Sequence, residues 1–402
     1  MRPLPPAAMS VNNHLPSGAT PVLDDAHWMW QALQCAERSL YVSAPNPRVG
    51  CVIVQDQVLL ASGFTQRAGQ AHAEIMALEQ AQALGFQDLS QSTFYVSLEP
   101  CSHHGRTRPC VDEIIRVRPR RVVIAMPDPN PQVAGRGIER LRAAGIEVVV
   151  GVLLEQAAWL NVGFVSRMLS GRPWLWLKIA SSMDGYTALE DGRSQWITGA
   201  AARERGHEWR ARSDLIVTGS GTIRADNPLL NVRAVPTVRP PLRGVFDGQL
   251  RLSPALRFFQ QQPVMVWACE GVDPAHVAAF EAQGVYVRLL PANQNGKVDL
   301  QAWLAWLGQQ EFNEIHVEAG AQLNGALLQA GLVDQVVGYV APTYLMQGRP
   351  AIDGSAPVDL DAAWRLNVIE CQKIGADVEL LMRNEARWQQ LLNQLIEQTE
   401  RL

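Results

Sequence analysis

Apolar residues along this chain fall into short continuous runs that are separated by helix-spaced sets. In the first half, runs rich in β-branched and aromatic residues at 51–54, 93–98 and 121–126 predict buried strands. Good helix formers fill 74–81 and 137–144, and they predict helices that cover the sheet. Strands that alternate with helices in this way predict an α/β layered domain.

The same alternation resumes after a Gly-Arg-Pro break at 171–173, which we take as a domain boundary. Runs such as 174–180 and 314–318 predict the strands of a second α/β domain. We therefore assign residues 24–170 to a first domain and residues 173–383 to a second.

The two ends of the chain lie outside this pattern. Residues 1–23 are rich in Pro, Ala, Ser and Asn, contain no apolar segment typical of a signal peptide, and are expected to form a disordered leader. Residues 384–402 carry apolar positions at spacing i, i+3, i+4, i+7 and i+8, which predicts an amphipathic helix. These positions are Trp388, Leu391, Leu392, Leu395 and Ile396. The sequence leaves open whether this helix packs on the second domain or on a second subunit.

Composition narrows the class of protein. With 47% hydrophobic and 18% charged residues among 402, the chain is typical of a globular protein with an ample core. A net charge of -4 disfavours a polynucleotide substrate, which a basic surface would bind. No apolar run approaches the length of a membrane span, so we expect no membrane contact. Six scattered cysteines favour a reducing compartment, the cytoplasm.

A His-x-Glu motif and two later Pro-Cys pairs are the strongest chemical signal. One imidazole and two thiolates are ligands of a catalytic zinc site, which leaves its fourth position to water. In zinc-dependent base deaminases the glutamate of this motif moves protons and does not bind the metal. We therefore predict that His72, Cys101 and Cys110 bind one zinc ion per chain and that Glu74 is the catalytic residue.

Taken singly, a cysteine is more often a small buried residue, and a histidine is more often a core or surface residue. Here the His-x-Glu motif precedes the first Pro-Cys pair by the length of one helix and one strand. That order favours the zinc site over two unrelated core residues.

The eight residues between the two cysteines depart from the commoner Cys-x-x-Cys spacing. Segment 101–110 closely resembles the deaminase half of the bifunctional riboflavin-biosynthesis deaminase/reductase family, and so do 44–51 and 128–137. The resemblance implies a cytidine-deaminase-like three-layer fold for the first domain. It also implies that Asn46, in a Pro-Asn-Pro turn, lies close to the bound pyrimidine. Without the family, a plain turn former accounts for Asn46 equally well.

Chemical signals in the second half are weaker by themselves. Lys178 interrupts an apolar run, and a charge there needs a partner or an anionic ligand. Residues 320–325 turn the chain from a strand into a helix, a geometry that aims backbone amides at a pyrophosphate. From the spacing alone, a glycine-lined loop without a ligand is equally consistent. Arg210 and Arg233 by themselves are typical of solvated surface charges.

The second half is similar to the reductase half of the same family, most clearly at 178–185, 194–198, 225–233 and 317–332. The resemblance spans about residues 24–383 and implies a dihydrofolate-reductase-like fold that uses NADPH. The residues it implies for NADPH binding are Ser181, Trp196, Thr198, Thr222, Asp226, Gly320, Ala321, Gln322, Leu323, Asn324 and Gly325. Those it implies for the ribose phosphate substrate are Lys178, Ser194, Arg210, Leu230, Arg233 and Glu318.

We therefore expect a bifunctional enzyme that catalyses consecutive steps of riboflavin synthesis on a small-molecule substrate. The first step is zinc-dependent hydrolytic deamination of 2,5-diamino-6-(5-phosphoribosylamino)pyrimidin-4-one. The second is NADPH-dependent reduction of the ribosyl group to ribityl. The alternative is a nucleic-acid base deaminase with an appended binding domain, which the acidic charge and the long loop between the cysteines disfavour. A third hypothesis is a non-catalytic zinc scaffold whose second half has lost reductase activity, which the sequence leaves open for the reductase only. The sequence also leaves open whether the chain forms a homo-oligomer such as a dimer or tetramer.

Overall fold

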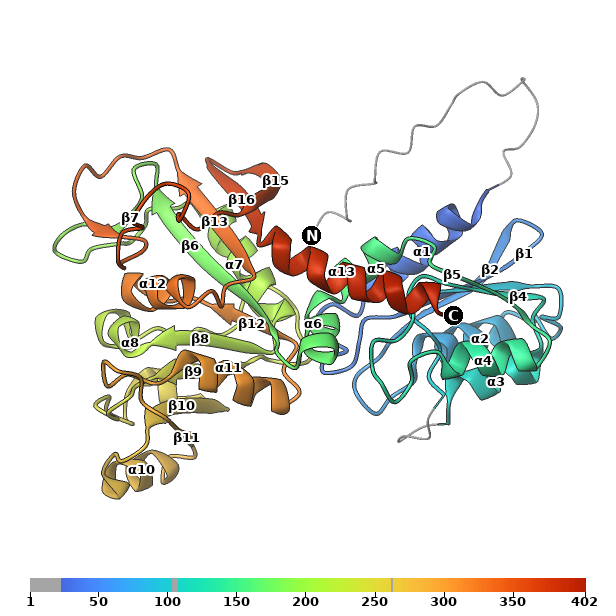
Figure 1. Cartoon of the computed structure of the whole chain (residues 1–402), viewed down its shortest axis with the longest axis horizontal. Helices are drawn as coiled ribbons and strands as arrows, with labels where there is room; N and C mark the ends of the chain where they lie inside the picture. Colours follow the sequence, from blue (N-terminus) through green and yellow to red (C-terminus); the bar gives the residue numbers. More distant parts are fainter. Residues whose placement is uncertain (1–22, 103–107, 262) are drawn as a thin grey trace. The chain divides into compact units, whose positions relative to one another are not determined.

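The computed structural model describes residues 23–102, 108–261 and 263–402, and it divides into two compact units (Figure 1). The first unit takes the chain up to Leu169 together with Gln390–Leu402, and the second takes Ser170–Gln389. The expected leader, apart from residue 23, lies outside the described residues, as does 103–107 in the loop between the two cysteines. No helix in the described ranges is both long enough and apolar enough to cross a bilayer.

The first unit is built on a five-stranded sheet in the order β2-β1-β3-β4-β5. Strand β1 is antiparallel to β2 and β3, whereas β3, β4 and β5 are parallel to one another. The strands are β1 (Gly50–Gln55), β2 (Val58–Phe64), β3 (Thr93–Val96), β4 (Arg121–Ile124) and β5 (Glu147–Val150). The helices are α1 (Asp25–Glu37), α2 (Ala73–Ala83), α3 (Cys110–Val117), α4 (Arg136–Ala143), α5 (Leu154–Leu160) and α6 (Val162–Ser170). Figure 1 shows α1 and α5 on one side of the sheet and α2, α3 and α4 on the other.

Close packing at one glycine places the start of α2 over this sheet. A Cβ at Gly63 of β2 would come within 2.1 Å of the Ala73 carbonyl oxygen, so a larger residue would push the helix away. His72 is the N-cap residue of the same helix. The sequence around Gly63 therefore helps to decide where the first predicted zinc ligand lies.

The second unit is built on a nine-stranded sheet in the order β11-β10-β9-β8-β12-β6-β13-β16-β15. The strands from β11 to β13 are parallel, and β16 and β15 are added antiparallel at one edge. The strands are β6 (Trp174–Ser182), β8 (Leu215–Gly219), β9 (Leu242–Phe246), β10 (Val264–Cys269), β11 (Tyr286–Leu290), β12 (Glu314–Val317), β13 (Gln335–Ala341), β15 (Asn367–Ile374) and β16 (Asp377–Arg383), with β7 (Tyr186–Ala188) and β14 (Arg349–Pro350) as a separate pair. The helices are α7 (Ala200–Arg212), α8 (Ser220–Asp226), α9 (Arg257–Gln260), α10 (Pro274–Glu281), α11 (Leu300–Gln309) and α12 (Ala321–Gln329).

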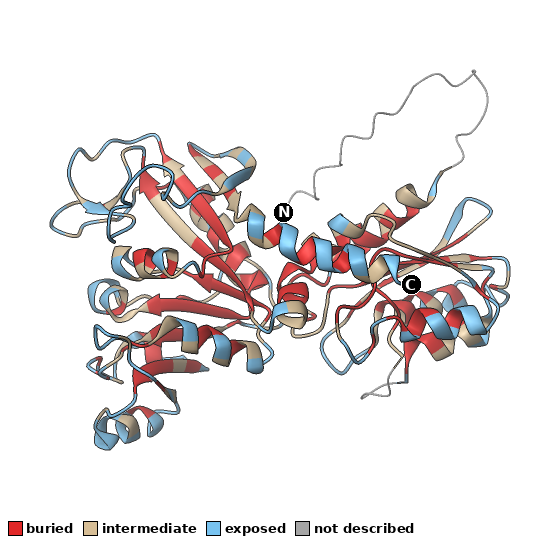
Figure 2. Ribbon diagram, in the orientation of Figure 1, coloured by how far each residue is buried: buried red, intermediate tan, exposed pale blue. Residues whose placement is uncertain are grey.

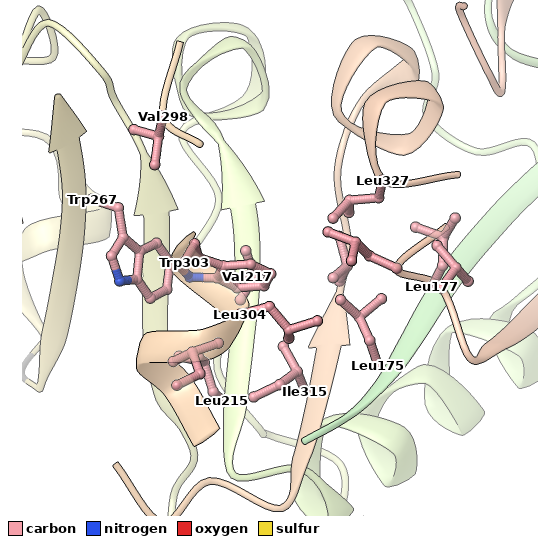
Figure 3. Close-up of a cluster of buried hydrophobic side chains, with 14 of the residues drawn as sticks. Leu175, Leu177, Leu215, Val217, Trp267, Val298, Trp303, Leu304, Ile315 and Leu327 are labelled. Carbon is pink, nitrogen blue, oxygen red and sulfur yellow. The ribbon is translucent and has the colours of Figure 1, made fainter. Parts of the chain in front are cut away.

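Alternate residues of the parallel strands supply two separate apolar cores. On β8, Leu215 and Val217 belong to one core and Ile216 belongs to the other. The first core also takes side chains from β6, β12, α11 and α12, namely Leu175, Leu177, Ile315, Trp303, Leu304 and Leu327 (Figure 3). Burial on both faces explains why these strands read as continuous apolar runs in the sequence (Figure 2).

A final helix, α13, occupies Glu385–Glu400. Four of its predicted apolar positions are buried, and the fifth, Ile396, is 38% exposed. From Gln390 onward this helix groups with the first unit, and its first turn groups with the second. The second domain is one of the two packing partners that the sequence left open for this segment, and the first turn agrees with it. The grouping of Gln390–Leu402 with the first unit was not among them.

Candidate active sites

Three potential metal ligands come together in the first unit. His72 Nδ1 lies 3.6 Å from Cys101 Sγ and 3.3 Å from Cys110 Sγ. A tetrahedral zinc ion with Zn–S bonds of ~2.3 Å and Zn–N bonds of ~2.0 Å needs its ligand atoms about 3.5–3.8 Å apart. The three side chains therefore fit a zinc ion, and they are the one such cluster found among the described residues.

The starts of two helices surround these ligand atoms. His72 caps α2, and Cys110 is the first residue of α3. The Cys110 backbone amide donates to Cys101 Sγ at 3.2 Å. Contacts with the Cys110 side chain, with His72 and with this amide outweigh burial and lower the pKa of Cys101 to about 4. The thiolate, which is the form that binds a metal, is thereby favoured.

Glu74 lies in the first turn of α2 and is only 3% exposed. Burial is the main cause that raises the pKa of Glu74 to about 7; the charge of Cys101 acts in the same direction, and His72 opposes it. A carboxyl whose pKa lies near the working pH can both take up and release a proton. The position and environment of Glu74 suit the role predicted for it.

Glu99, which sequence reasoning did not single out, fixes the backbone next to the predicted zinc ligand Cys101. Its buried carboxylate accepts hydrogen bonds from the backbone amides of Asp128, Gly135 and Gly137 at 3.1, 2.9 and 2.8 Å. Glu99 stands two residues before Cys101, so it ties the loop 128–137 to the backbone that carries this ligand. The available signal was a glutamate directly before a Pro-Cys pair.

Asn46 lies in the turn between α1 and β1 and is partly buried. Its backbone amide donates to the Ser43 carbonyl at 3.0 Å. The buried side chain of Arg48 donates to the Leu160 carbonyl at 2.8 Å and anchors the end of the turn. The contact of Asn46 with a pyrimidine stays a prediction.

In the second unit, Glu318 gathers three basic side chains just after β12. Arg210 Nη2 lies 2.8 Å from Glu318 Oε2, and Arg210 Nε binds the other carboxylate oxygen. Lys178 Nζ lies 4.0 Å from Oε2, and His316 Nε2 lies 3.2 Å from Oε1. Burial by itself would raise the pKa of Glu318, but Arg210, His316 and Lys178 together hold that pKa well below its usual range.

Lys178 comes from β6, the strand next to β12, which explains how residues far apart in sequence meet here. Burial lowers the pKa of Lys178, and the Glu318 carboxylate opposes this effect. The predicted substrate residues Lys178, Arg210 and Glu318 are therefore brought together. His316, which is fully buried beside them, was not predicted, because an alternating strand position is also typical of a core histidine.

The segments that follow β8 and β12 lie side by side, because these strands are parallel neighbours. A Cβ at Gly320 would lie 3.8 Å from Thr222 Oγ1, so two of the predicted cofactor residues are adjacent. Gly320 is exposed and caps α12 with its backbone, and no side chain of the described residues caps the start of this helix. The first amides of a helix have no partner inside it and can bind an anion such as a pyrophosphate.

Two further residues of this predicted cofactor segment contact the protein. Asn324 Nδ2 donates to the Ala351 carbonyl at 2.9 Å. A Cβ at Gly325 would come within 1.8 Å of the Asp353 carbonyl oxygen, so only glycine fits there. Both residues are buried, and they hold the segment 351–353 against α12.

The other residues predicted for the second unit differ in exposure. Trp196 is 67% exposed and stacks on the Arg203 guanidinium, whose carbon lies 4.3 Å from the ring centre. The Leu230 side chain belongs to the second apolar core, which leaves its backbone for a ligand. Ser181 and Thr198 are buried. The remaining predicted residues are partly or fully exposed, namely Ser194, Asp226, Arg233, Ala321, Gln322 and Leu323.

Three arginines hold the loop that carries Leu230 and Arg233 by its backbone carbonyls. Arg210 donates to the Asn231 carbonyl at 3.2 Å, and Arg243 donates to the Leu229 carbonyl at 2.7 Å. Arg257 donates to the Asn227 carbonyl at 2.6 Å. Sequence reasoning missed Arg243 and Arg257, because an arginine that binds a carbonyl leaves no motif.

Comparison with known proteins bears on both halves. The family described as the cytidine and deoxycytidylate deaminase zinc-binding region matches residues 23–126, and the RibD C-terminal domain matches residues 173–380. The riboflavin biosynthesis protein RibD of Escherichia coli (strain K12) is 43% identical over 335 residues, which cover 80% of this chain and 89% of that protein. The chain belongs to the RibD family. The RibD of Haemophilus influenzae is 37% identical and covers 89% of this chain and 96% of its own length.

Solved RibD structures match most of the chain. Acinetobacter baumannii RibD, form 1, is 39% identical with a TM-score of 0.80, and the match covers 89% of this chain and 98% of that one. A Thermotoga maritima structure is 31% identical with a TM-score of 0.78 over the same shares. It is described as a diaminohydroxyphosphoribosylaminopyrimidine deaminase/5-amino-6-(5-phosphoribosylamino)uracil reductase.

This member of the family is therefore a bifunctional deaminase and reductase of riboflavin biosynthesis, with a cytidine-deaminase-like domain followed by a RibD C-terminal reductase domain. Its cofactors are zinc in the first half and NADPH in the second. The expected fold class and function are confirmed, and the family match over both halves sets aside the nucleic-acid base deaminase.

Proposed function

We propose that this enzyme carries out its two reactions with the residues that the sequence singled out. His72, Cys101 and Cys110 hold the zinc, and Glu74 moves protons beside it. The observation that carries the proposal is the convergence of these three ligand atoms, in a zinc-sized triangle, at the start of the helix that contains the buried Glu74. The substrate is 2,5-diamino-6-(5-phosphoribosylamino)pyrimidin-4-one.

In the deaminase site, the zinc ion when bound supplies the Lewis acidity that activates water. Glu74 accepts the proton that the attacking water loses, and it then delivers a proton to the departing amino nitrogen, so that ammonia leaves. Its burial excludes bulk water, which would otherwise compete as a proton donor. Asn46 holds the pyrimidine ring in place.

In the reductase site, NADPH when bound supplies the hydride that reduces C1′ of the ribosyl group. The amides at the start of α12 and the neighbouring Thr222 bind the cofactor phosphates. The ionised Glu318 accepts hydrogen bonds from ribose hydroxyls, and Lys178 lies near the reacting carbon. Arg233, which is exposed, contacts the substrate phosphate.

The proposed domain limits are residues 24–170 for the deaminase and 173–383 for the reductase. Two observations support these limits. The deaminase family match ends at residue 126 and the reductase family match begins at residue 173, and the compact units divide between Leu169 and Ser170. We also propose a cytoplasmic location, which is supported by six cysteines of which none forms a disulfide in the structure.

A homo-oligomer, either a dimer or a tetramer, is part of the proposal. Val358 and Leu360 of the second unit are 93% and 80% exposed, and large exposed apolar side chains are typical of surfaces that bind another protein. Light scattering on the purified protein would measure the mass in solution, and a monomer would contradict this part.

The experiment that tests the function uses the purified protein with the diaminopyrimidinone ribosylamine phosphate. Ammonia release and NADPH oxidation are followed separately. We expect both, with NADPH oxidation delayed until the deaminated product accumulates. Ammonia release without NADPH oxidation would mean that the second half is an inactive scaffold.

A further inference from the structure

The last residues of the described chain pack on the loop whose backbone amides donate to Glu99, two residues before Cys101. Gln398 Nε2, in the last turn of α13, donates to the Asp128 carbonyl at 2.9 Å. Leu402 lies directly against Gly135, where a Cβ would come within 2.6 Å of Leu402 Cδ2. The Arg142 guanidinium of α4 donates to the Leu402 backbone oxygen. All of these residues belong to the first unit.

The contacted loop is the one whose amides are bound by Glu99. Asp128 and Gly135 each donate a backbone hydrogen bond to Glu99 Oε2, and Asp128 also accepts the bond from Gln398. Gly137, in the first turn of α4 directly after the loop, lies against the Pro100 carbonyl, which a Cβ there would approach to 2.3 Å. Pro100 is bonded to Cys101. A continuous set of contacts therefore runs from the final helix to a predicted zinc ligand.

We propose that residues 398–402 form a positioning element for the deaminase site. They hold the loop 128–137 on Glu99, and this loop in turn fixes the backbone that presents Cys101. The inference rests on the proposed zinc and Glu74 roles. The RibD C-terminal domain match ends at residue 380, so the element lies beyond the sequence that defines the reductase family.

A metal ligand is oriented by the groups that contact it and its backbone from outside the metal site. Loss of such outer groups typically costs ~10–100-fold in metal affinity or activity. A displacement of about 1 Å at a reacting centre can cost ~100-fold in rate. The reductase site shares none of the contacts described for residues 398–402, so its rate should not change.

The decisive variant is Gln398→Glu in the full chain. It keeps the size of the side chain but replaces the amide donor with a carboxylate that repels the Asp128 carbonyl. The matched control is Gln394→Glu, the same change one turn earlier, at an exposed position of α13. A second variant ends the chain at Glu397 and removes the whole element.

Three properties are measured on each protein loaded with zinc. These are kcat and KM for ammonia release, the rate at which a chelator extracts the zinc, and NADPH oxidation with substrate that is already deaminated. Cobalt(II) in place of zinc adds a fourth, because its absorption spectrum reports the ligand geometry directly.

For Gln398→Glu we expect deamination kcat to fall ~10-fold, KM to stay within about twofold, and zinc extraction to become ~10-fold faster. The cobalt spectrum should shift, NADPH oxidation should stay at the wild-type rate, and Gln394→Glu should behave as wild type. The shortened chain should show larger losses of the same kind.

Two results would overturn the inference. In one, kcat, zinc extraction and the cobalt spectrum stay at wild-type values in Gln398→Glu and in the shortened chain. In the other, both activities fall in parallel with the melting temperature, which would make the segment a general stabiliser. If the wild-type protein itself neither binds zinc nor releases ammonia, the proposed function fails, and that outcome is separate from either of these.

Discussion

Arg210 and Glu318 form a two-pronged ion pair, in which Arg210 Nη2 lies 2.8 Å from Glu318 Oε2 and Arg210 Nε binds the second oxygen. The family resemblance implies that both residues hold the same substrate. The Glu318 carboxylate already occupies two donors of the Arg210 guanidinium and offsets its charge. Arg210 therefore has less charge to offer a phosphate. Arg233 lies exposed on the adjacent loop, where its guanidinium donates to the Asn231 side-chain oxygen, so it is the cation better placed to bind a phosphate.

Replacement of Arg233 should therefore weaken substrate binding in the reductase site. Hydrogen bonds between arginine and phosphate are charge-assisted, and each contributes roughly 1.5–3 kcal/mol. We expect Arg233→Ala to raise the substrate KM by about one to two decades with kcat little changed. Steady-state NADPH oxidation measures this, with the exposed Arg251→Ala as the control. An unchanged KM would show that Arg233 is only a surface charge.

Removal of one thiolate should release the metal. Cys110→Ser replaces a soft sulfur ligand with a hydroxyl that zinc binds poorly, so we expect most of the zinc to be lost. Metal analysis of the purified variant measures the zinc content per chain. Cys371→Ser, at an exposed free cysteine of the second unit, is the control and should keep its zinc. Equal zinc content in both variants would exclude Cys110 as a ligand.

A single change of oxygen to nitrogen should separate the two activities. Glu74→Gln keeps the shape of the buried side chain but cannot move protons, so ammonia release should fall by about 10²–10⁴-fold. Zinc content, and NADPH oxidation with deaminated substrate, should stay near wild type, because Glu74 lies in the other unit. Near-normal ammonia release would rule out Glu74 as the proton carrier, and loss of both activities with zinc intact would show that the two sites are coupled.

The stability of the second unit should depend on the protonation of His207. Burial, with added repulsion from Arg210 and Arg233, lowers the pKa of His207 to about 4. The folded state then binds fewer protons than the unfolded state between about pH 6.5 and about pH 4, so stability is lost as the pH falls through this window. His207→Gln should lose less stability than wild type over the same window. Urea unfolding at several pH values measures the difference, and identical pH profiles would contradict the assignment.

Gly325 should tolerate no side chain. Its Cβ would overlap the Asp353 carbonyl, so Gly325→Ala must displace the segment 351–353, and overpacking of this kind typically costs about 1–3 kcal/mol. Gly206→Ala in α7 is the control, because its added Cβ would meet no described atom within 4 Å apart from the nearby backbone of its own helix, and alanine favours a helix. In urea unfolding, the free energy of unfolding should be lower than wild type for Gly325→Ala and higher than wild type for Gly206→Ala. Equal stability of Gly325→Ala and wild type would mean that the segment moves freely.

The strands and the zinc cluster could be predicted because their signals are local. Apolar runs mark strands that are buried on both faces, and His72, Cys101 and Cys110 each stand in a short motif. The residues that sequence reasoning missed act across long separations. Glu99 binds amides more than twenty residues away, and His316 reaches its site through strand pairing. Such partners depend on the tertiary fold, which no spacing along the chain encodes.

The placement of α13 could not be predicted for a similar reason. An amphipathic pattern identifies which face of a helix is buried, but it does not identify the surface that buries it. Trp388 and Leu395 lie on the same apolar stripe of one helix, yet they belong to different compact units. One apolar stripe of a single helix therefore contributes buried residues to both units.

The grouping of Gln390–Leu402 with the first unit also sets an order of assembly on the ribosome. Domains fold largely as they emerge, from the N-terminal end. Here the deaminase half must wait for its final element until all of Ser170–Gln389 has been translated. A gene cut at the boundary between the halves would deliver a deaminase that lacks this element, whereas a fused gene supplies it within the same polypeptide.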